Sequence, residues 1–531
     1  MSTEESMPAQ RGQDLSRQGG VVAGMTLVSR ITGLLRDVIL SYLFGASAVA
    51  DMFFVALRIP NFFRRLFAEG AFNQAFVPVL TRYANEGRAS LLAFIAPLSG
   101  LFALTLSLVV LLGVLMAPQI TALFAPGFVA DEAKLEATAA LVRITFPYLG
   151  FIALTAYAGS LLNVHGRFAL PAFTPVLLNL SLIAAALTAL AGVTHWPAAS
   201  VLAWGVLLAG LMQLLVQLPV LVRLGLLPRP NLEHRQSGVR QVGKLLVPAV
   251  LAASVGQINA LVNTALASTL MTGSIAWLYY ADRLLELPIG LVAVALGTVM
   301  LPHLSRQVAQ DDRQQFRRTL DWGLNLGLML AMPAAVALFV LAEGLLASLY
   351  MSFATGAMTA LDVRMAALAL QMFAVALPGF VLVKILAPAF FANEDTRTPL
   401  RYAAGAVAAN LMVSLASFRW FGHVGLAWAT AISAWTHALL LYAGLRRQEL
   451  YTLTGQVWPL LWRTLLSSTV LGGVLVVVAP ADMWLEVDPW ARLGWILGIS
   501  LAGMLLYVGL MALLGVRLAH IRHISGTDPG L

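Results

Sequence analysis

Residues 55–82, VALRIPNFFRRLFAEGAFNQAFVPVLTR, decide the fold, because a similar apolar stretch occurs again later in the chain as an internal repeat. It aligns without a gap on residues 279–306, YYADRLLELPIGLVAVALGTVMLPHLSR, and its closing VPVLTR matches LPHLSR. A second pair, LNVHGRFALP at 162–171 and ANEDTRTPLR at 392–401, lies at nearly the same displacement. A repeat on this scale predicts two helical lobes of the same topology. The alternative is a chance match of two loop endings that contain Pro and Arg.

The composition indicates an integral membrane protein. Of the 531 residues, 60% are hydrophobic and only 11% are charged, whereas a soluble domain carries about 25% charged residues. Most of the chain falls into apolar windows of about 20 residues, the length of a helix that crosses a hydrocarbon core of about 30 Å. The sequence contains no Cys, which excludes disulfides, thiolate metal ligands and thiol nucleophiles. The predicted fold class is an all-α polytopic membrane protein.

The apolar windows predict fourteen transmembrane helices. They lie near 20–46, 50–84, 90–117, 134–163, 168–192, 198–222, 243–271, 274–303, 317–342, 361–392, 399–418, 421–445, 461–480 and 491–516. Lys and Arg collect in the loops after the even-numbered helices, so by the positive-inside rule these loops and both termini are cytoplasmic. The same distribution accounts for the net charge of +8 without a nucleic-acid partner.

The expected helices divide the chain into two pseudo-symmetric six-helix lobes and an appended helix pair. The segments are a cytoplasmic tail (1–19), the first lobe (20–222), a basic cytoplasmic linker (223–242), the second lobe (243–447), two additional helices (458–517) and a cytoplasmic tail (518–531).

Charged side chains inside three of the expected helices are the candidate functional residues. The cations are Arg30, Arg36, Arg64 and Arg283, and the carboxylates are Asp37, Asp51, Glu69 and Glu286. An arginine at the bilayer centre costs about 2.5–3.5 kcal/mol on insertion scales, so such residues face the bundle interior or a water-filled cavity. Arg283 and Glu286 are spaced for pairing along one helix, as are Arg65 and Glu69. The structural alternative for each cation is a buried ion pair or a side chain that extends to the interface.

An arginine-rich cavity fits an anion with several oxygen atoms. The planar guanidinium group presents fixed N–H donors that match a phosphate, so the sequence predicts a phosphate-bearing ligand for these arginines. Ser29, Asn61 and Lys384 are further candidate cavity contacts. The chain contains no Walker A pattern, no H-E-x-x-H metal motif and no G-x-S-x-G elbow, so ATP hydrolysis, metalloprotease and serine-hydrolase chemistry are not expected.

Four motifs give the chain a resemblance to a known family. They are SRITGLLRD (29–37), DMFFVALRIPNFFRRLFAEGAFNQAFVPV (51–79), WLYYADRLLELPIGLVAVALGTVMLPHLS (277–305) and KILAPAFFANEDTRTP (384–399). Together they look like the corresponding motifs of the MurJ (MviN) family of lipid II flippases, within the MOP superfamily. The resemblance implies a V-shaped, two-lobed bundle in the bacterial inner membrane that works by alternating access. It implies no enzymatic activity and a substrate made of undecaprenyl pyrophosphate linked to a disaccharide-pentapeptide. Membrane lipids and other cell-wall synthesis proteins are the further partners that it implies.

The resemblance also assigns roles to the charged residues. The family's functional arginines correspond to Arg30, Arg36, Arg64 and Arg283, and its cavity lysine corresponds to Lys384. Its acidic residues correspond to Asp37, Asp51 and Glu69, for which we expect a role in gating or in positioning the arginines rather than in substrate binding. The last two helices of relatives form a groove for the lipid tail. Some relatives hold a sodium ion with carboxylates, but the expected helix 243–271 offers only Gln257, Asn259 and Asn263, so no cofactor or sodium site is expected here and monovalent-cation coupling stays open.

Three other functions compete with this interpretation. A multidrug or cation antiporter of the MATE type has the same fold, but it predicts a cavity dominated by carboxylates. A flippase for another polyprenyl-pyrophosphate glycan, of the O-antigen type, predicts the same cavity charge. A membrane-bound glycosyltransferase needs a larger loop with catalytic groups than any between the expected helices.

Overall fold

The computed structural model describes residues 6–66, 71–227, 229–233, 236–351, 356–455, 457–481 and 483–516, with side chains described from residue 20 onward except at a few helical positions. Within these ranges the regular elements are helices and no strand occurs, which confirms the all-α fold. Contacts between Cα atoms divide the chain into two compact units. Unit 1 comprises residues 1–43 and 48–269, and unit 2 comprises residues 44–47 and 270–531.

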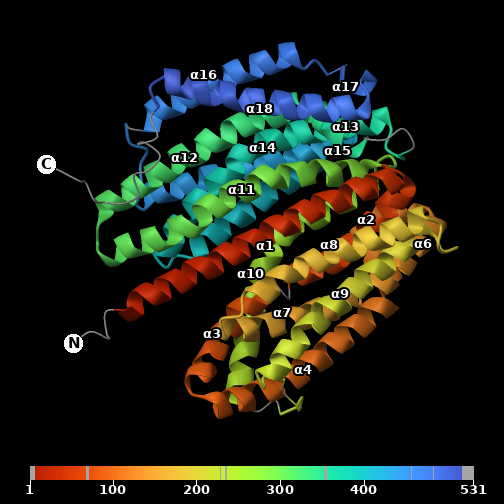
Figure 1. The fold of residues 1–531 in the computed structure, drawn as a ribbon, viewed down its shortest axis with the longest axis vertical. Helices are drawn as coiled ribbons and strands as arrows, with labels where there is room; N and C mark the ends of the chain where they lie inside the picture. The colour runs from red at the N-terminus through yellow and green to blue at the C-terminus, as the bar shows by residue number, and fades with distance from the viewer. Residues whose placement is uncertain are drawn as a thin grey trace. The chain divides into compact units, whose positions relative to one another are not determined.

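Unit 1 consists of ten α-helices and one short 3-10 helix among the described residues. Their bounds are α1 (Ser6–Phe44), α2 (Ala48–Arg64), α3 (Ala71–Asn85), α4 (Arg88–Leu115), α5 (Ala117–Phe124), η2 (Pro126–Ala130), α6 (Glu132–Thr145), α7 (Tyr148–Val164), α8 (Ala169–Leu190), α9 (Ala198–Arg223) and α10 (Ser237–Ser268). Helix α9 packs against α7 and α8, and α3 packs against α10 (Figure 1). An aromatic core joins α3, α4 and α7, because Tyr157 stacks on Phe76 at 5.2 Å and Tyr83 stacks on Phe94 at 4.4 Å between ring centroids.

Unit 2 contains the remaining helices. Their bounds are α11 (Ser274–Ala309), α12 (Arg313–Val340), α13 (Ala342–Tyr350), α14 (Ala360–Ala392), α15 (Arg397–Arg447), α16 (Val457–Val478), α17 (Met483–Glu486) and α18 (Pro489–Leu513). Helix α14 packs against α11, α12 and α15, which makes it the central helix of this unit. Helices α16 and α18 run side by side, and α16 packs along α12 (Figure 1).

Polar side chains mark where several helices begin. Asp131 accepts a hydrogen bond from the Lys134 amide at the start of α6, and Asp312 does the same for the Gln315 amide at the start of α12. Thr359 opens α14 with a reciprocal capping box. Each cap satisfies an amide that lacks a partner in the first helical turn, so these short polar residues set the helix starts.

Several helices differ in extent from the expected membrane spans. Helix α1 begins at Ser6 rather than near residue 20, because the polar tail contains Gln, Arg and Leu, which are good helix formers. The expected helix 134–163 matches one candidate membrane span, Glu132–Val164, which contains a short break between α6 and α7 where Pro147 has no N–H to donate to the preceding turn. The expected helix 50–84 includes α2 and α3, and part of the segment between them lies outside the described residues, so its continuity stays a prediction.

The number of transmembrane helices is not established by these boundaries. Nine helices of the described residues are long and apolar enough to cross a membrane, and one of them, α15, contains a kink at Gly422 with a positive φ of 57°. The kink lies at the second residue of the expected helix 421–445, close to the end of the expected helix 399–418. Fourteen helices and the proposed lobe boundaries therefore stay predictions. By contacts, α10 belongs to unit 1, although the repeat places the expected helix 243–271 at the start of the second lobe.

Candidate functional site

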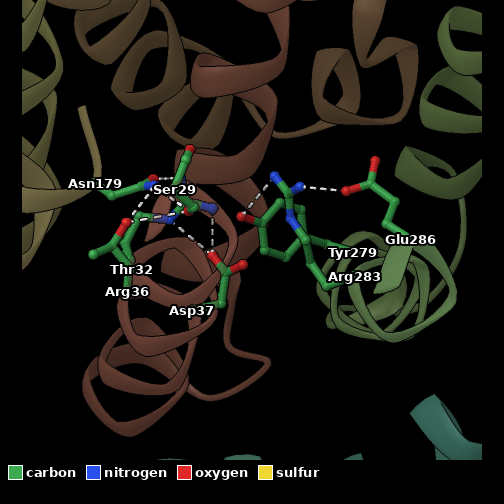
Figure 2. A network of polar contacts seen from close by, with 8 residues as sticks. All are labelled: Ser29, Thr32, Arg36, Asp37, Asn179, Tyr279, Arg283 and Glu286. Atoms are coloured by element: carbon green, nitrogen blue, oxygen red, sulfur yellow. Dashed lines mark hydrogen bonds and ion pairs between the residues drawn. The ribbon is translucent and has the colours of Figure 1, made fainter. Parts of the chain in front are cut away.

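The buried centre of the candidate site in unit 1 is Arg36 on α1. Its guanidinium group is held from two sides (Figure 2): Nη2 and Nε donate to Asp37 Oδ1 at 2.7 and 2.9 Å, and Nη1 donates to Asn179 Oδ1 at 2.8 Å. Arg36 is 6% exposed and Asp37 is 1% exposed. The carboxylate offsets part of the cost of burying the cation, and the hydrogen bonds fix the plane of the guanidinium group.

Asn179 on α8 connects this ion pair to the backbone of α1. Its Nδ2 donates to the carbonyl oxygen of Ser29 at 2.9 Å and to Oγ1 of Thr32 at 3.1 Å (Figure 2). Ser29, a candidate cavity contact, therefore meets the network through its carbonyl group. The sequence analysis missed Asn179, although an amide in the middle of the apolar stretch PVLLNLSLIAA was a usable signal, because buried polar groups in membranes are normally hydrogen-bonded.

The C-terminal end of α2 presents Arg64. Its Nε donates to Asn61 Oδ1 at 3.1 Å, and Asn61 Nδ2 donates to the Leu57 carbonyl at 2.9 Å. Pro60 lies in the same turn and has no N–H, so the Ala56 carbonyl lacks its usual helical donor. The hydroxyl of Thr145 donates to that carbonyl at 3.0 Å, which ties α2 to the end of α6.

One buried tyrosine interacts with both Arg36 and Arg64. Tyr148, the first residue of α7, interacts electrostatically with both guanidinium groups. Arg36 lies on α1, Arg64 at the end of α2 and Tyr148 at the start of α7, all within unit 1.

In unit 2 the candidate residues lie on α11. Arg283 Nη1 donates to Glu286 Oε2 at 2.7 Å, and Nη2 is 3.5 Å from the Tyr279 hydroxyl. The Arg283 guanidinium carbon also lies 5.1 Å from the centre of the Tyr279 ring (Figure 2). The expected pairing of Arg283 with Glu286 along one helix is confirmed. Both side chains are partly exposed, so this ion pair contributes little to stability and leaves the arginine accessible.

The other candidates lie apart from these two groups or cannot be placed. Arg30 is partly buried on α1, and Asp51 is buried in the first turn of α2, where a carboxylate is stabilised by the helix dipole. Lys384 is exposed on α14. Glu69 lies outside the described residues, so its expected pairing with Arg65 stays a prediction. The substrate-binding and gating roles of all these residues stay predictions as well.

The described residues contain no group of three or more His, Asp or Glu side chains placed to hold a metal ion. The polar side chains of the two groups are instead suited to an anion, because each group contains a guanidinium that is already oriented by a carboxylate on its own helix.

The fold can be compared with the folds of solved structures. A solved structure described as the inward-facing conformation of a multidrug resistance MATE family transporter of the MOP superfamily covers 80% of this chain and 95% of its own, with a TM-score of 0.66 at 14% identity. A structure described as lipid II flippase MurJ, inward closed conformation, covers 93% of this chain and 98% of its own, with a TM-score of 0.78 at 25% identity. The protein is a multi-pass membrane protein that shares its fold with these two structures.

Sequence relationships specify the family within that class. The family described as lipid II flippase MurJ matches residues 40–488. A probable lipid II flippase MurJ of Vibrio cholerae serotype O1 is 42% identical over 518 residues, which cover 96% of this chain and 98% of the relative. The chain belongs to the MurJ family of lipid II flippases.

Proposed function

We propose that this protein moves lipid II from the cytoplasmic to the outer leaflet of the bacterial inner membrane. The observation that carries the proposal is the full-length similarity to chains named lipid II flippases, together with the conservation of fold in the MurJ structure. The protein transports its substrate and makes or breaks no covalent bond, so it is not an enzyme. The proposed cycle requires no bound cofactor.

The oriented arginines support recognition of the pyrophosphate group. Arg36 is fixed by Asp37 and Asn179, so little conformational freedom is lost when it meets an anion. Arg64 and Arg283 are partly exposed and each has a polar neighbour on its own helix. We assign the four candidate arginines to the pyrophosphate of the substrate, and the carboxylates Asp37, Asp51, Glu69 and Glu286 to gating or to positioning of the arginines.

Electrostatics contributes to two steps of the proposed cycle. The headgroup enters from the cytoplasmic side while the lipid tail stays in the hydrocarbon, and an anion between mutually repelling guanidinium groups lowers the cost of closing the site around it. Each elementary charge that crosses the membrane gains or loses about 2.3 kcal/mol per 100 mV. The membrane potential therefore biases any step that moves net charge. Both termini are assigned to the cytoplasm, and α16 with α18 to the lipid tail.

A depletion-and-rescue experiment tests the proposal. The endogenous lipid II flippase of a bacterium is depleted, this chain is expressed, and exposure of lipid II is measured with an enzyme that cleaves only outward-facing headgroups. Wild-type protein restores exposure, whereas Arg36→Ala does not. The matched control is Arg143→Ala on α6, because Arg143 is 39% exposed and pairs with Glu136 at the surface.

Two outcomes contradict the proposal in different ways. If the wild-type protein is inserted in the membrane and lipid II stays inside, the substrate is wrong and another polyprenyl-pyrophosphate glycan becomes the leading candidate. If wild type and Arg36→Ala both restore exposure, the substrate stands but the buried arginine is structural.

A further inference from the structure

Helix α2 contains a proline one turn before its last residue, Arg64. A proline has no N–H, so Pro60 leaves the Ala56 carbonyl without its usual helical donor. Ala56 is 0% exposed, so water does not reach this carbonyl from the surface. A proline is also a place where a helix bends. The direction of the last turn of α2, and with it the position of Arg64, therefore depends on the contacts that hold α2 on both sides of Pro60.

The end of α6 supplies the missing donor. The Thr145 hydroxyl donates to the Ala56 carbonyl at 3.0 Å, and Thr145 is 0% exposed. The same hydroxyl lies 3.4 Å from the Val142 carbonyl of its own helix, so the contact with α2 is the shorter of the two. A side-chain hydroxyl of a neighbouring helix is one of the groups that satisfy a carbonyl freed by proline inside a membrane. Thr145 therefore takes the place of the N–H that Pro60 lacks.

The residue after Thr145 holds α2 on the other side of the proline. The Phe146 ring packs edge-on against the ring of Phe63, the neighbour of Arg64, at 5.6 Å between centroids. Phe146 is 1% exposed, and a Cβ atom added at Gly113 on α4 would lie 1.9 Å from its ring, so α4 closely approaches this ring as well. Two adjacent residues at the end of α6 therefore hold α2 both before and after its proline.

Arg64 takes its orientation from the turn of α2 that contains the proline. Its Nε donates to Asn61 Oδ1 at 3.1 Å, and Asn61 Nδ2 donates to the Leu57 carbonyl at 2.9 Å. These two bonds lie within α2, so they orient the guanidinium group relative to its own helix. The direction of α2 after the proline is set by the contacts with Thr145 and Phe146.

A hydrogen bond of the same kind occurs in unit 2. Pro333 in α12 leaves the Met329 carbonyl without its helical donor, and the Tyr507 hydroxyl of α18 donates to that carbonyl at 2.8 Å. In both units a hydroxyl from a neighbouring helix therefore replaces the donor that a proline removes. In unit 1 the helix held in this way carries a candidate arginine.

We propose that Thr145 is a positioning residue for substrate binding, whose hydroxyl holds the Ala56 carbonyl, sets the direction of the last turn of α2 and thereby aims Arg64 at the phosphate oxygens of the ligand. The ligand class is a polyprenyl pyrophosphate, so this inference rests on the proposed function. Thr145 acts through Arg64 rather than on the ligand itself.

The test compares threonine variants on the same helix. Thr145→Val keeps the branched side chain and removes only the hydroxyl, whereas Thr145→Ser keeps the hydroxyl. Thr138→Val is the matched control, because Thr138 is also 0% exposed and its hydroxyl donates within α6, to the Lys134 carbonyl at 2.7 Å. Binding of lipid II, undecaprenyl pyrophosphate and undecaprenol to the purified full-length protein in nanodiscs is measured for each variant.

Thr145→Val is expected to weaken binding of both pyrophosphate ligands about threefold to tenfold, the range that corresponds to one neutral hydrogen bond, and to leave undecaprenol binding unchanged. Thr145→Ser and Thr138→Val are expected to bind all three lipids as the wild type does. Pro60→Ala restores an N–H to the turn, so Thr145→Val is expected to have a smaller effect in the Pro60→Ala background than in the wild type. A full effect in that background overturns the inference, because the hydroxyl then does not act through the Ala56 carbonyl.

The absence of Cys from the chain allows a direct measurement at the end of α2. The thiol of the Arg64→Cys variant is labelled with a charged, water-soluble reagent. Adding Thr145→Val is expected to raise the labelling rate about threefold to tenfold, because the last turn of α2 opens more often without its hydrogen bond. Adding Thr138→Val is expected to leave the rate unchanged. Equal rates with and without Thr145→Val contradict the positioning role.

Wild-type affinity for the pyrophosphate ligands in a stable Thr145→Val protein overturns the inference and leaves the proposed function intact. An equal loss for undecaprenol, or the same selective loss in Thr138→Val, also overturns it, because a general packing defect is then the cause. If Thr145→Val alone does not fold, the comparison is made in the Pro60→Ala background, where a folded protein with the affinity of Pro60→Ala supports the inference and any other result overturns it. If the wild-type protein binds neither pyrophosphate ligand more tightly than undecaprenol, the proposed function itself is wrong.

Discussion

Replacing Asn179 by Leu tests whether the amide on α8 orients the buried arginine. Leu has a similar volume and no polar atoms, so the change removes three hydrogen bonds, with Arg36, Ser29 and Thr32, and opens little space. The bond from the arginine is charge-assisted and is worth about 1.5–3 kcal/mol, and the two neutral bonds are worth about 0.5–1.5 kcal/mol each. Because the three bonds share one side chain, their contributions overlap, and we expect a net loss of about 3 kcal/mol.

Two measurements separate orientation from stability. In thermal unfolding of the purified protein, a loss of this size corresponds to a drop on the order of 5 °C in Tm. In the depletion-and-rescue experiment, we expect Asn179→Leu to expose less lipid II than wild type even when protein levels are matched. Leu180→Ala is the control on the same helix, because the Leu180 side chain is exposed and should change neither quantity by much.

The reasoning is refuted by a specific result. If Asn179→Leu is as stable and as active as wild type, the other interactions of Arg36 suffice to hold it and the amide has no positioning role. A variant that loses stability but restores lipid II exposure at wild-type rates limits Asn179 to folding.

Three further predictions concern other parts of the fold. Tyr451→Phe removes a donor to the buried carboxylate of Asp321 on α12, so we expect about 1.5–3 kcal/mol less stability and looser attachment of the loop before α16, measured by thermal unfolding and limited proteolysis. Gly113→Ala places a Cβ atom 1.9 Å from the Phe146 ring, and we expect overpacking to cost about 1–3 kcal/mol, measured as a lower Tm. The pKa of Asp395, in the loop before α15, is lowered chiefly by a side-chain hydrogen bond from Thr398. The ionised carboxylate therefore stabilises the fold above its unfolded pKa, and this stabilisation is lost as the pH falls through the folded pKa. We expect Asp395→Asn to lower Tm at neutral pH and to have no effect on Tm at acid pH.

Local patterns in the sequence predicted much of this protein. Hydropathy gives the all-α membrane class, because every backbone polar group inside a bilayer needs a partner within its own helix. The pairing of Arg283 with Glu286 follows from their spacing on one helix, and no knowledge of neighbouring helices is needed. The arginine motifs at 29–37 and 64–72 identified the family, which the full-length comparisons show.

Packing alone decided the surroundings of the site. Asn179 meets Arg36 across 143 positions of sequence, and the Thr145 hydroxyl donates to the Ala56 carbonyl across 89 positions. The turn Phe44–Ser47 belongs to unit 2 although the helices on both sides of it belong to unit 1. Helical period and hydropathy report only what a residue does within its own helix. Which helices face one another is set by side-chain fit between segments far apart in the chain, and the partners of a buried polar group are chosen only when that fit is complete.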